Sequence, residues 1–366
     1  MAKNPKPVKI KRYKRNSASP KTVVFKKVLT VAAGVVLLIA AGFLLGKPVV
    51  NFFAGLDFSA PSEQTSSQQQ PDSSDGQRSQ SGSEPVQVSD TSIYYYADIS
   101  QMTTEGGIDS VIAAAKTAGA DHCVFDLKDA SGYIHYNSEN QYAQKLKADT
   151  VADLDMVVKK MNENGITPVA RVYTFMDRMI SSVERGAAVK YQGTESLWLD
   201  TSAALGGKSW ANPASSIMQS YITDITDEIL SKGIKEIIYA GYSTPTGYSL
   251  DKRDFGASTE QVLANMKNLL NTLKSKASAK GGRAIWQFEY SATASGGDYA
   301  QYIVHPFQLG AENVIITADA SQVSDISAVE SLKKIARDNG ITHFALWMTD
   351  GTTLENIQSA GSYFVR

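Results

Sequence analysis

Strand-like and helix-like segments alternate from residue 93 to the end of the chain, and this alternation limits the fold more than any other feature. The helix-like segments have a 3.6-residue apolar period, and several end at glycine, a common helix stop. Such alternation over about 270 residues predicts a parallel sheet. The predicted strands are 93–99, 122–128, 166–173, 236–240, 284–290, 313–319 and 342–348.

The length and the strand count favour a TIM-like (β/α)8 barrel. Only seven strands are clear, so the eighth is expected to be short, irregular or missing. A doubly wound sheet is the alternative fold. It would usually carry a glycine-rich phosphate-binding turn after the first strand, and EGGIDS at 105–110 does not match that turn.

Three segments of different composition precede the predicted barrel at 92–366. Residues 1–27 hold ten Lys and Arg and no acid, and residues 28–46 are uncharged and mostly apolar. This pattern predicts a single transmembrane helix at 28–46 with a basic cytoplasmic tail, although a cleaved signal peptide stays open as an alternative. The Ser- and Gln-rich residues 47–91 predict a disordered extracellular linker. The protein is therefore expected at the cell membrane, single-pass, with its C-terminal domain outside.

Charge and reactive residues exclude several functions. Beyond residue 27 the chain holds 26 basic and 37 acidic residues, which argues against a nucleic-acid partner. Cys123 is the only cysteine, so no intrachain disulfide is possible. The four histidines fall in separate elements without metal-ligand spacing, and we predict neither a metal site nor a cofactor.

Polar and aromatic residues stand at the ends of the predicted strands, where a (β/α)8 barrel has its active site. Strand alternation predicts that Asp126 and Lys128 share an inward face. Paired carboxylates on two sides of a sugar linkage are what glycoside hydrolysis requires, and Glu289 with Asp126 is the predicted catalytic pair. The predicted substrate-binding residues are Asp98, Lys128, Arg171, Tyr173, Asp319 and Trp347.

Structural roles stay open for several of these residues. Asp98 at a strand end can cap the following turn. Asp126 with Lys128 can form an internal ion pair at the barrel mouth. An inward Arg171 must find an acid or a ligand, and Glu289 is one possible partner.

The order of several segments resembles a bacterial family of putative glycosyl-hydrolase-like (β/α)8 barrel domains of unknown function. The resemblance covers most of residues 93–350. It rests on VFDLKDASGYIHY, GITPVARVYTFMDRMISS, AVKYQGTESLWLD followed by SWANP, and YITDITDEILSKGIKEIIY. Family residues that carry over are Asp126, Lys128, Asp129, Arg171, Phe175, Asp177, Trp210, Asn212 and Pro213. The resemblance implies carbohydrate as the substrate class.

The segment KEIIYAGYSTPTGY departs from the family pattern. Glu236 and Pro245 are kept, but Ala240 falls where the family has an Asp, and Ser243 falls where it has an Arg. The resemblance implies that a catalytic candidate is missing there. The first hypothesis is therefore a degenerate hydrolase that binds cell-envelope polysaccharide. The alternatives are an active glycosidase that uses Glu289 as acid/base and Asp126 as nucleophile or second base, and a non-enzymatic envelope scaffold.

Overall fold

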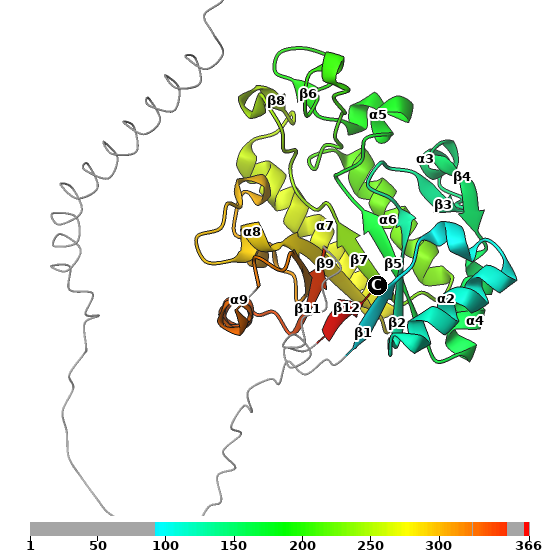
Figure 1. Cartoon of the computed structure of the whole chain (residues 1–366). Helices are drawn as coiled ribbons and strands as arrows, with labels where there is room; N and C mark the ends of the chain where they lie inside the picture. The colour runs from blue at the N-terminus through cyan, green and yellow to red at the C-terminus, as the bar shows by residue number, and fades with distance from the viewer. Residues whose placement is uncertain (1–91, 324, 350–361, 366) are drawn as a thin grey trace, which may run out of the picture. The chain divides into compact units, whose positions relative to one another are not determined.

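The computed structural model describes residues 92–323, 325–349 and 362–365 (Figure 1). The basic tail, the transmembrane helix and the linker predicted for residues 1–91 lie outside the described residues. Within the described part of the chain, no helix has both the length and the apolar character that crossing a membrane requires.

Eight parallel strands form a closed ring. Each strand pairs in parallel with the next, and β1 pairs with both β2 and β12, so the ring has no open edge. The strands of the ring are β1 (Ile93–Tyr96), β2 (His122–Lys128), β5 (Thr167–Tyr173), β7 (Glu236–Ala240), β9 (Arg283–Glu289), β10 (Asn313–Ala318), β11 (His343–Met348) and β12 (Ser362–Val365). The parallel arrangement predicted for a TIM-like fold is confirmed. The eighth strand, β12, has only four residues.

Helices follow most of the strands and cover the outside of the ring (Figure 1). The α-helices are α2 (Glu105–Thr117), α3 (Gln141–Lys145), α4 (Leu154–Glu163), α5 (Ile180–Val183), α6 (Ser216–Ser231), α7 (Thr259–Ala279), α8 (Tyr290–Thr293) and α9 (Ile326–Asp338). The 3-10 turns are η1 (Ile99–Met102), η2 (Arg185–Ala187), η3 (Ala203–Leu205), η4 (Leu250–Lys252), η5 (Ala300–Tyr302) and η6 (Pro306–Leu309). In α7, Met266, Leu270 and Leu273 are buried at helical spacing, and Ser258 caps the helix together with Gln261.

The inside of the ring is a packed core. Strand alternation sends one side chain of each pair inward, and the inward residues form a separate apolar cluster. Its buried members are Tyr94, Val124, Val169, Ile238, Ile285, Ile315, Ala345, Trp347 and Phe364. The rings of Trp347 and Phe364 stack with centroids 4.2 Å apart. The outward residues pack under the helices in a second, larger core.

A β-bulge in β2 changes the face on which the strand's last residue lies. Asp126 pairs with Arg171, but the next pairing joins Lys128 to Val172, which shifts the register by one residue. Val172 belongs to the outer core, so Lys128 lies on the outward face. The prediction that Asp126 and Lys128 share an inward face is therefore wrong, because the bulge interrupts the alternation.

Two long connections build additional structure beyond the C-terminal ends of β5 and β7. Residues 174–215 contain β6 (Lys190–Tyr191), and residues 241–258 contain β8 (Arg253–Asp254), which pairs antiparallel with β6. Val189, Trp198 and Trp210 form a small core within this region. Two further strands, β3 (Ile134–Tyr136) and β4 (Lys147–Ala152), extend the sheet beside β2: β3 pairs antiparallel with β2 and parallel with β4.

Candidate functional site

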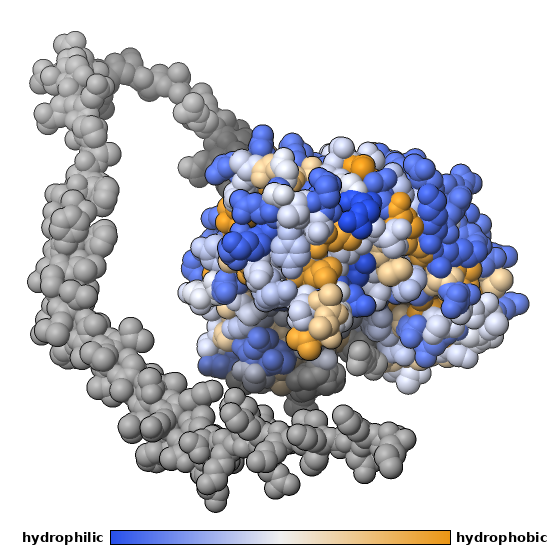
Figure 2. All heavy atoms as spheres, turned by 90° about the horizontal axis from the view of Figure 1, so that it is seen from above, coloured by the Kyte–Doolittle hydropathy of each residue, from blue (hydrophilic) through white to orange (hydrophobic). Residues whose placement is uncertain are grey.

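A cleft of about 530 Å³ lies at the C-terminal ends of the strands. Its walls come from the ends of β5, β7, β9 and β10 and from the connection 174–215. Aromatic and polar side chains share the lining, among them Tyr173, Trp210, Gln287, Glu289 and Tyr302. Viewed from above, hydrophilic groups dominate the surface, with hydrophobic groups scattered between them (Figure 2). Such a mixed concave surface suits a polar organic ligand.

Glu289 is the predicted site residue that the cleft exposes most. It ends β9, its side chain is exposed, and it lines the cleft. The side-chain amide of Gln301 donates a long hydrogen bond of 3.4 Å to Oε2 of Glu289. The position at a strand end, predicted from the sequence, is confirmed. The role of Glu289 in catalysis stays a prediction.

Asp200 is a second carboxylate in the cleft, and the sequence analysis did not single it out. Its Oδ1 accepts a hydrogen bond of 2.8 Å from the backbone N–H of Lys208. Its Oδ2 accepts one of 3.3 Å from the indole of Trp210, and the Arg178 guanidinium lies 3.9 Å away. Asp200 follows no strand, so the strand-end rule could not find it. The only signal was its place in the segment that resembles the family.

Asp126 points into the barrel, as predicted, but both of its carboxylate oxygens are engaged. Arg171 donates to Oδ1 through Nε and to Oδ2 through Nη2, the latter at 2.9 Å. The hydroxyl of Tyr96 also donates to Oδ2, at 3.1 Å. Arg171 therefore pairs with Asp126 rather than with Glu289. A carboxylate bound on both oxygens is poorly placed to attack a sugar, and the catalytic role of Asp126 stays a prediction without support from its contacts.

Three aromatic rings surround the Arg171 guanidinium. Its central carbon lies 4.9, 5.2 and 4.5 Å from the ring centroids of Tyr96, Tyr173 and Trp347. Burial, which lowers the pKa of Arg171, is outweighed by the carboxylate of Asp126, so the pKa is raised. Burial raises the pKa of Tyr96 to about 12. Arg171, Tyr173 and Trp347 were predicted to bind substrate, and the structure brings them together, with Tyr173 also reaching the cleft.

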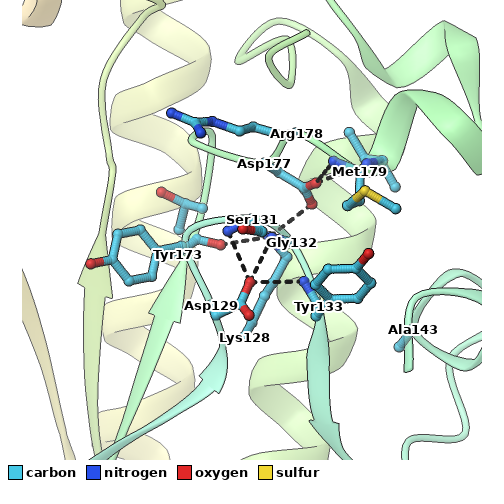
Figure 3. A network of polar contacts seen from close by, with 12 residues as sticks. Lys128, Asp129, Ser131, Gly132, Tyr133, Ala143, Tyr173, Asp177, Arg178 and Met179 are labelled. Carbon is cyan, nitrogen blue, oxygen red and sulfur yellow. Dashed lines mark hydrogen bonds and ion pairs between the residues drawn. The ribbon is translucent and has the colours of Figure 1, made fainter. Parts of the chain in front are cut away.

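Lys128 lies in a network of polar contacts within the protein and does not line the cleft (Figure 3). Its side chain is fully buried, with Nζ 2.7 Å from Oδ2 of Asp177 and 2.8 Å from the carbonyl oxygen of Tyr173. The carboxylate of Asp177 in turn accepts backbone N–H groups from Met179 and Ile180. The bulge turns this side chain away from the barrel mouth, so its contacts give no support to the predicted substrate-binding role of Lys128, which stays a prediction.

The other predicted acids stabilise turns. Asp98 caps η1 by accepting the backbone N–H of Ser100, and this hydrogen bond lowers the pKa of Asp98. Asp319 accepts the backbone N–H of Gln322 at 3.0 Å. These contacts match the capping alternative for Asp98. They leave substrate binding by either residue as a prediction.

The loop after β7, residues 241–247, forms one wall of the cleft without any acidic or basic side chain. Ile238 lies in the inner core, so Ala240 shares the inward face, where its side chain is completely buried. Gly241 and Ser243 line the cleft. Gly241 has a φ of +57°, and a Cβ atom there would lie 2.5 Å from Cβ of Met176. The sharp turn at Gly241 thus lets the loop pass closely over the β5 connection.

No group of three or more His, Cys, Asp and Glu that could hold a metal ion occurs within residues 92–323, 325–349 and 362–365. The polar groups in the cleft include two carboxylates, the guanidinium of Arg178, amides and hydroxyls.

A ring of eight parallel strands with carboxylates and aromatic rings in a cleft at the strand ends defines a glycoside-hydrolase-like barrel domain. Residues 93–281 match a family described as "Putative glycosyl hydrolase domain". The chain belongs to this family, in agreement with the resemblance seen in the sequence.

One solved structure supports the fold. The glycoside hydrolase domain of PgaB (BpsB) from Bordetella bronchiseptica matches with a TM-score of 0.53 and 9% identity, over 76% of this chain and 94% of that one. A hypothetical protein from Ruminiclostridium thermocellum matches with a TM-score of 0.43 and 20% identity, over 50% of this chain and 92% of that one. No curated protein matches the sequence.

Proposed function

We propose that this domain binds a polysaccharide of the cell envelope without hydrolysing it, and that residues 28–46 anchor it in the cell membrane. The observation that carries the proposal is Ala240. It occupies a fully buried inward position at the end of β7, where the resemblance implies an acid. Asp126, one of the two acids of the predicted catalytic pair, has both of its oxygens engaged by Arg171 and Tyr96.

The cleft retains the features that sugar binding needs. The half-buried ring of Tyr173 offers an apolar face, and Glu289 and Gln287 offer hydrogen-bonding groups for hydroxyls, whereas Trp210 and Tyr302 in the lining are only 5% and 4% exposed. Binding therefore does not depend on the missing acid. The proposed anchor rests on the uncharged segment 28–46 and on the basic residues before it.

Two assays on the full-length chain in detergent micelles test this proposal. An array of envelope polysaccharides measures binding, and release of new reducing ends measures hydrolysis. We expect binding without release. Glu289→Gln should weaken binding, whereas Glu163→Gln, on the exposed end of α4, should not. If no envelope polysaccharide binds, the proposal is refuted.

An active glycoside hydrolase is the second candidate, because Glu289 and Asp200 line the same cleft. In this function Glu289 acts as acid/base, and Asp200 replaces Asp126 as the second carboxylate. The separation of two such groups decides between inversion and retention. Release of reducing ends that is lost in both Glu289→Gln and Asp200→Asn would favour this function. Turnover that survives Glu289→Gln would refute the acid/base role of Glu289.

A further inference from the structure

A second cleft of about 450 Å³ adjoins the first. Thr246, Glu289 and Gln301 line both clefts, so the two clefts meet at these three residues. The second cleft lies against α8 and the 241–258 connection, where Leu250, Arg253 and Ser291 line it. We refer to the two adjoining clefts together as the groove, with Glu289 at their junction.

Because the two clefts adjoin at Glu289, we infer that the groove binds an internal stretch of a linear polysaccharide chain, with sugar units on both sides of Glu289. The inference rests on the proposed function and makes the ligand more specific. A terminal sugar would need a pocket closed at one end. A chain that continues in both directions needs space on both sides of the central residue, and the two adjoining clefts provide that space.

The second cleft has its own groups for holding sugars. Arg253 uses Nε to bind the carbonyl oxygen of Leu250 and Nη1 to bind that of Pro245, at 2.9 and 2.7 Å. These bonds fix its guanidinium at the cleft wall, and Nη2 has no hydrogen bond to the described residues. Tyr299, beside the lining residue Ala300, is 41% exposed and can offer its ring to a sugar face.

The 241–247 loop, which has no acidic or basic side chain, helps to hold the groove in shape. Thr244 accepts from Arg253 and donates its hydroxyl to the carbonyl oxygen of Gln301, at 3.3 and 2.9 Å. The backbone N–H of Thr244 donates to the same oxygen at 2.8 Å. The 241–247 loop is therefore tied to the β9–β10 connection at the point where the two clefts meet. The uncharged side chains of this loop leave space for a ligand to pass.

The test measures affinity against chain length, using the full-length protein and the disaccharides and hexasaccharides of the chitin, cellulose and amylose series. In at least one series, the hexasaccharide should bind about tenfold or more tightly than the disaccharide, since two added hydrogen bonds supply that much. Ser291→Trp fills the second cleft and should remove this advantage. Ser275→Trp, on the exposed face of α7, is the matched control and should retain it.

Each remaining outcome refutes a distinct statement. If every series that binds does so with equal affinity for both lengths, the groove is refuted and the proposed function stays intact. A length advantage that survives Ser291→Trp also refutes the groove. If no member of any series binds, the groove is refuted for these linear chains, and the array of envelope polysaccharides decides the proposed function separately.

Discussion

Replacing Lys128 by methionine tests the structural role that the bulge in β2 gives to this residue. The ammonium group is completely buried against Asp177, whose side chain is also completely buried. Methionine fills a similar volume but leaves the carboxylate of Asp177 with only the two backbone N–H groups on Oδ1. An uncompensated buried charge of this kind lowers the free energy of unfolding by about 3–5 kcal/mol. That is a large fraction of the roughly 5–15 kcal/mol that holds a domain folded.

Urea unfolding of the full-length chain, followed by circular dichroism, measures the change. Lys159→Met is the control, because its pair with Glu163 is exposed at 4.0 Å and contributes at most about 1 kcal/mol. In the double variant Lys128→Met with Asp177→Asn the buried charge is gone, and we expect it to be more stable than Lys128→Met alone. The reasoning is wrong if Lys128→Met destabilises the protein no more than Lys159→Met does. A loss of glycan binding in a fully stable Lys128→Met protein would return this residue to the ligand site.

Two further predictions follow from local geometry. Gly241→Ala should destabilise the fold more than Gly119→Ala. Both positions have a positive φ, which costs about 1–2 kcal/mol for alanine. Only at Gly241 does the new Cβ also meet another side chain, that of Met176. Equal urea midpoints for the two variants would contradict this. Burial lowers the pKa of His122, but the carboxylates of Glu236, at 3.7 Å, and Asp121, at 2.8 Å, outweigh burial and raise the pKa above 6.5. Its stabilising contribution is therefore complete below a pH of about 6.5 and is lost as the pH rises through the folded-state pKa. The stability difference between wild type and His122→Gln should thus be larger at a pH of about 5.5 than at about 8.5, and a difference independent of pH would refute it.

The barrel could be predicted from the sequence because its signal is repeated. Each strand is a short apolar run followed by a helical segment, and errors in one unit do not alter the others. β7 was predicted at its observed bounds. β12 was missed because four residues, Ser362–Val365, are too few to show a periodic pattern.

The candidate site was predictable only where side chains follow regular alternation. Asp126, Arg171 and Glu289 lie on the inward face as the pattern indicates. Lys128 does not, because a single bulge reverses the faces and leaves no mark in the local composition. Asp200 lies in an irregular connection, where contacts with Trp210 and the backbone of Lys208 set its position. Contacts between residues of an irregular loop leave no periodic pattern in the sequence.

The pairing of β12 with β1 has a consequence for the order in which the protein acquires its structure. The first strand of the ring has one neighbour, β2, close in sequence, while its other neighbour, β12, is the last strand of the ring in chain order. Phe364, which stacks on Tyr94 and Trp347 inside the ring, arrives with that strand. Until then β1 and β11 present unpaired edges, which are prone to pair with other chains. Closure of the ring therefore requires that β12 has been synthesised, and a growing chain of this protein depends on protection of both edges until then.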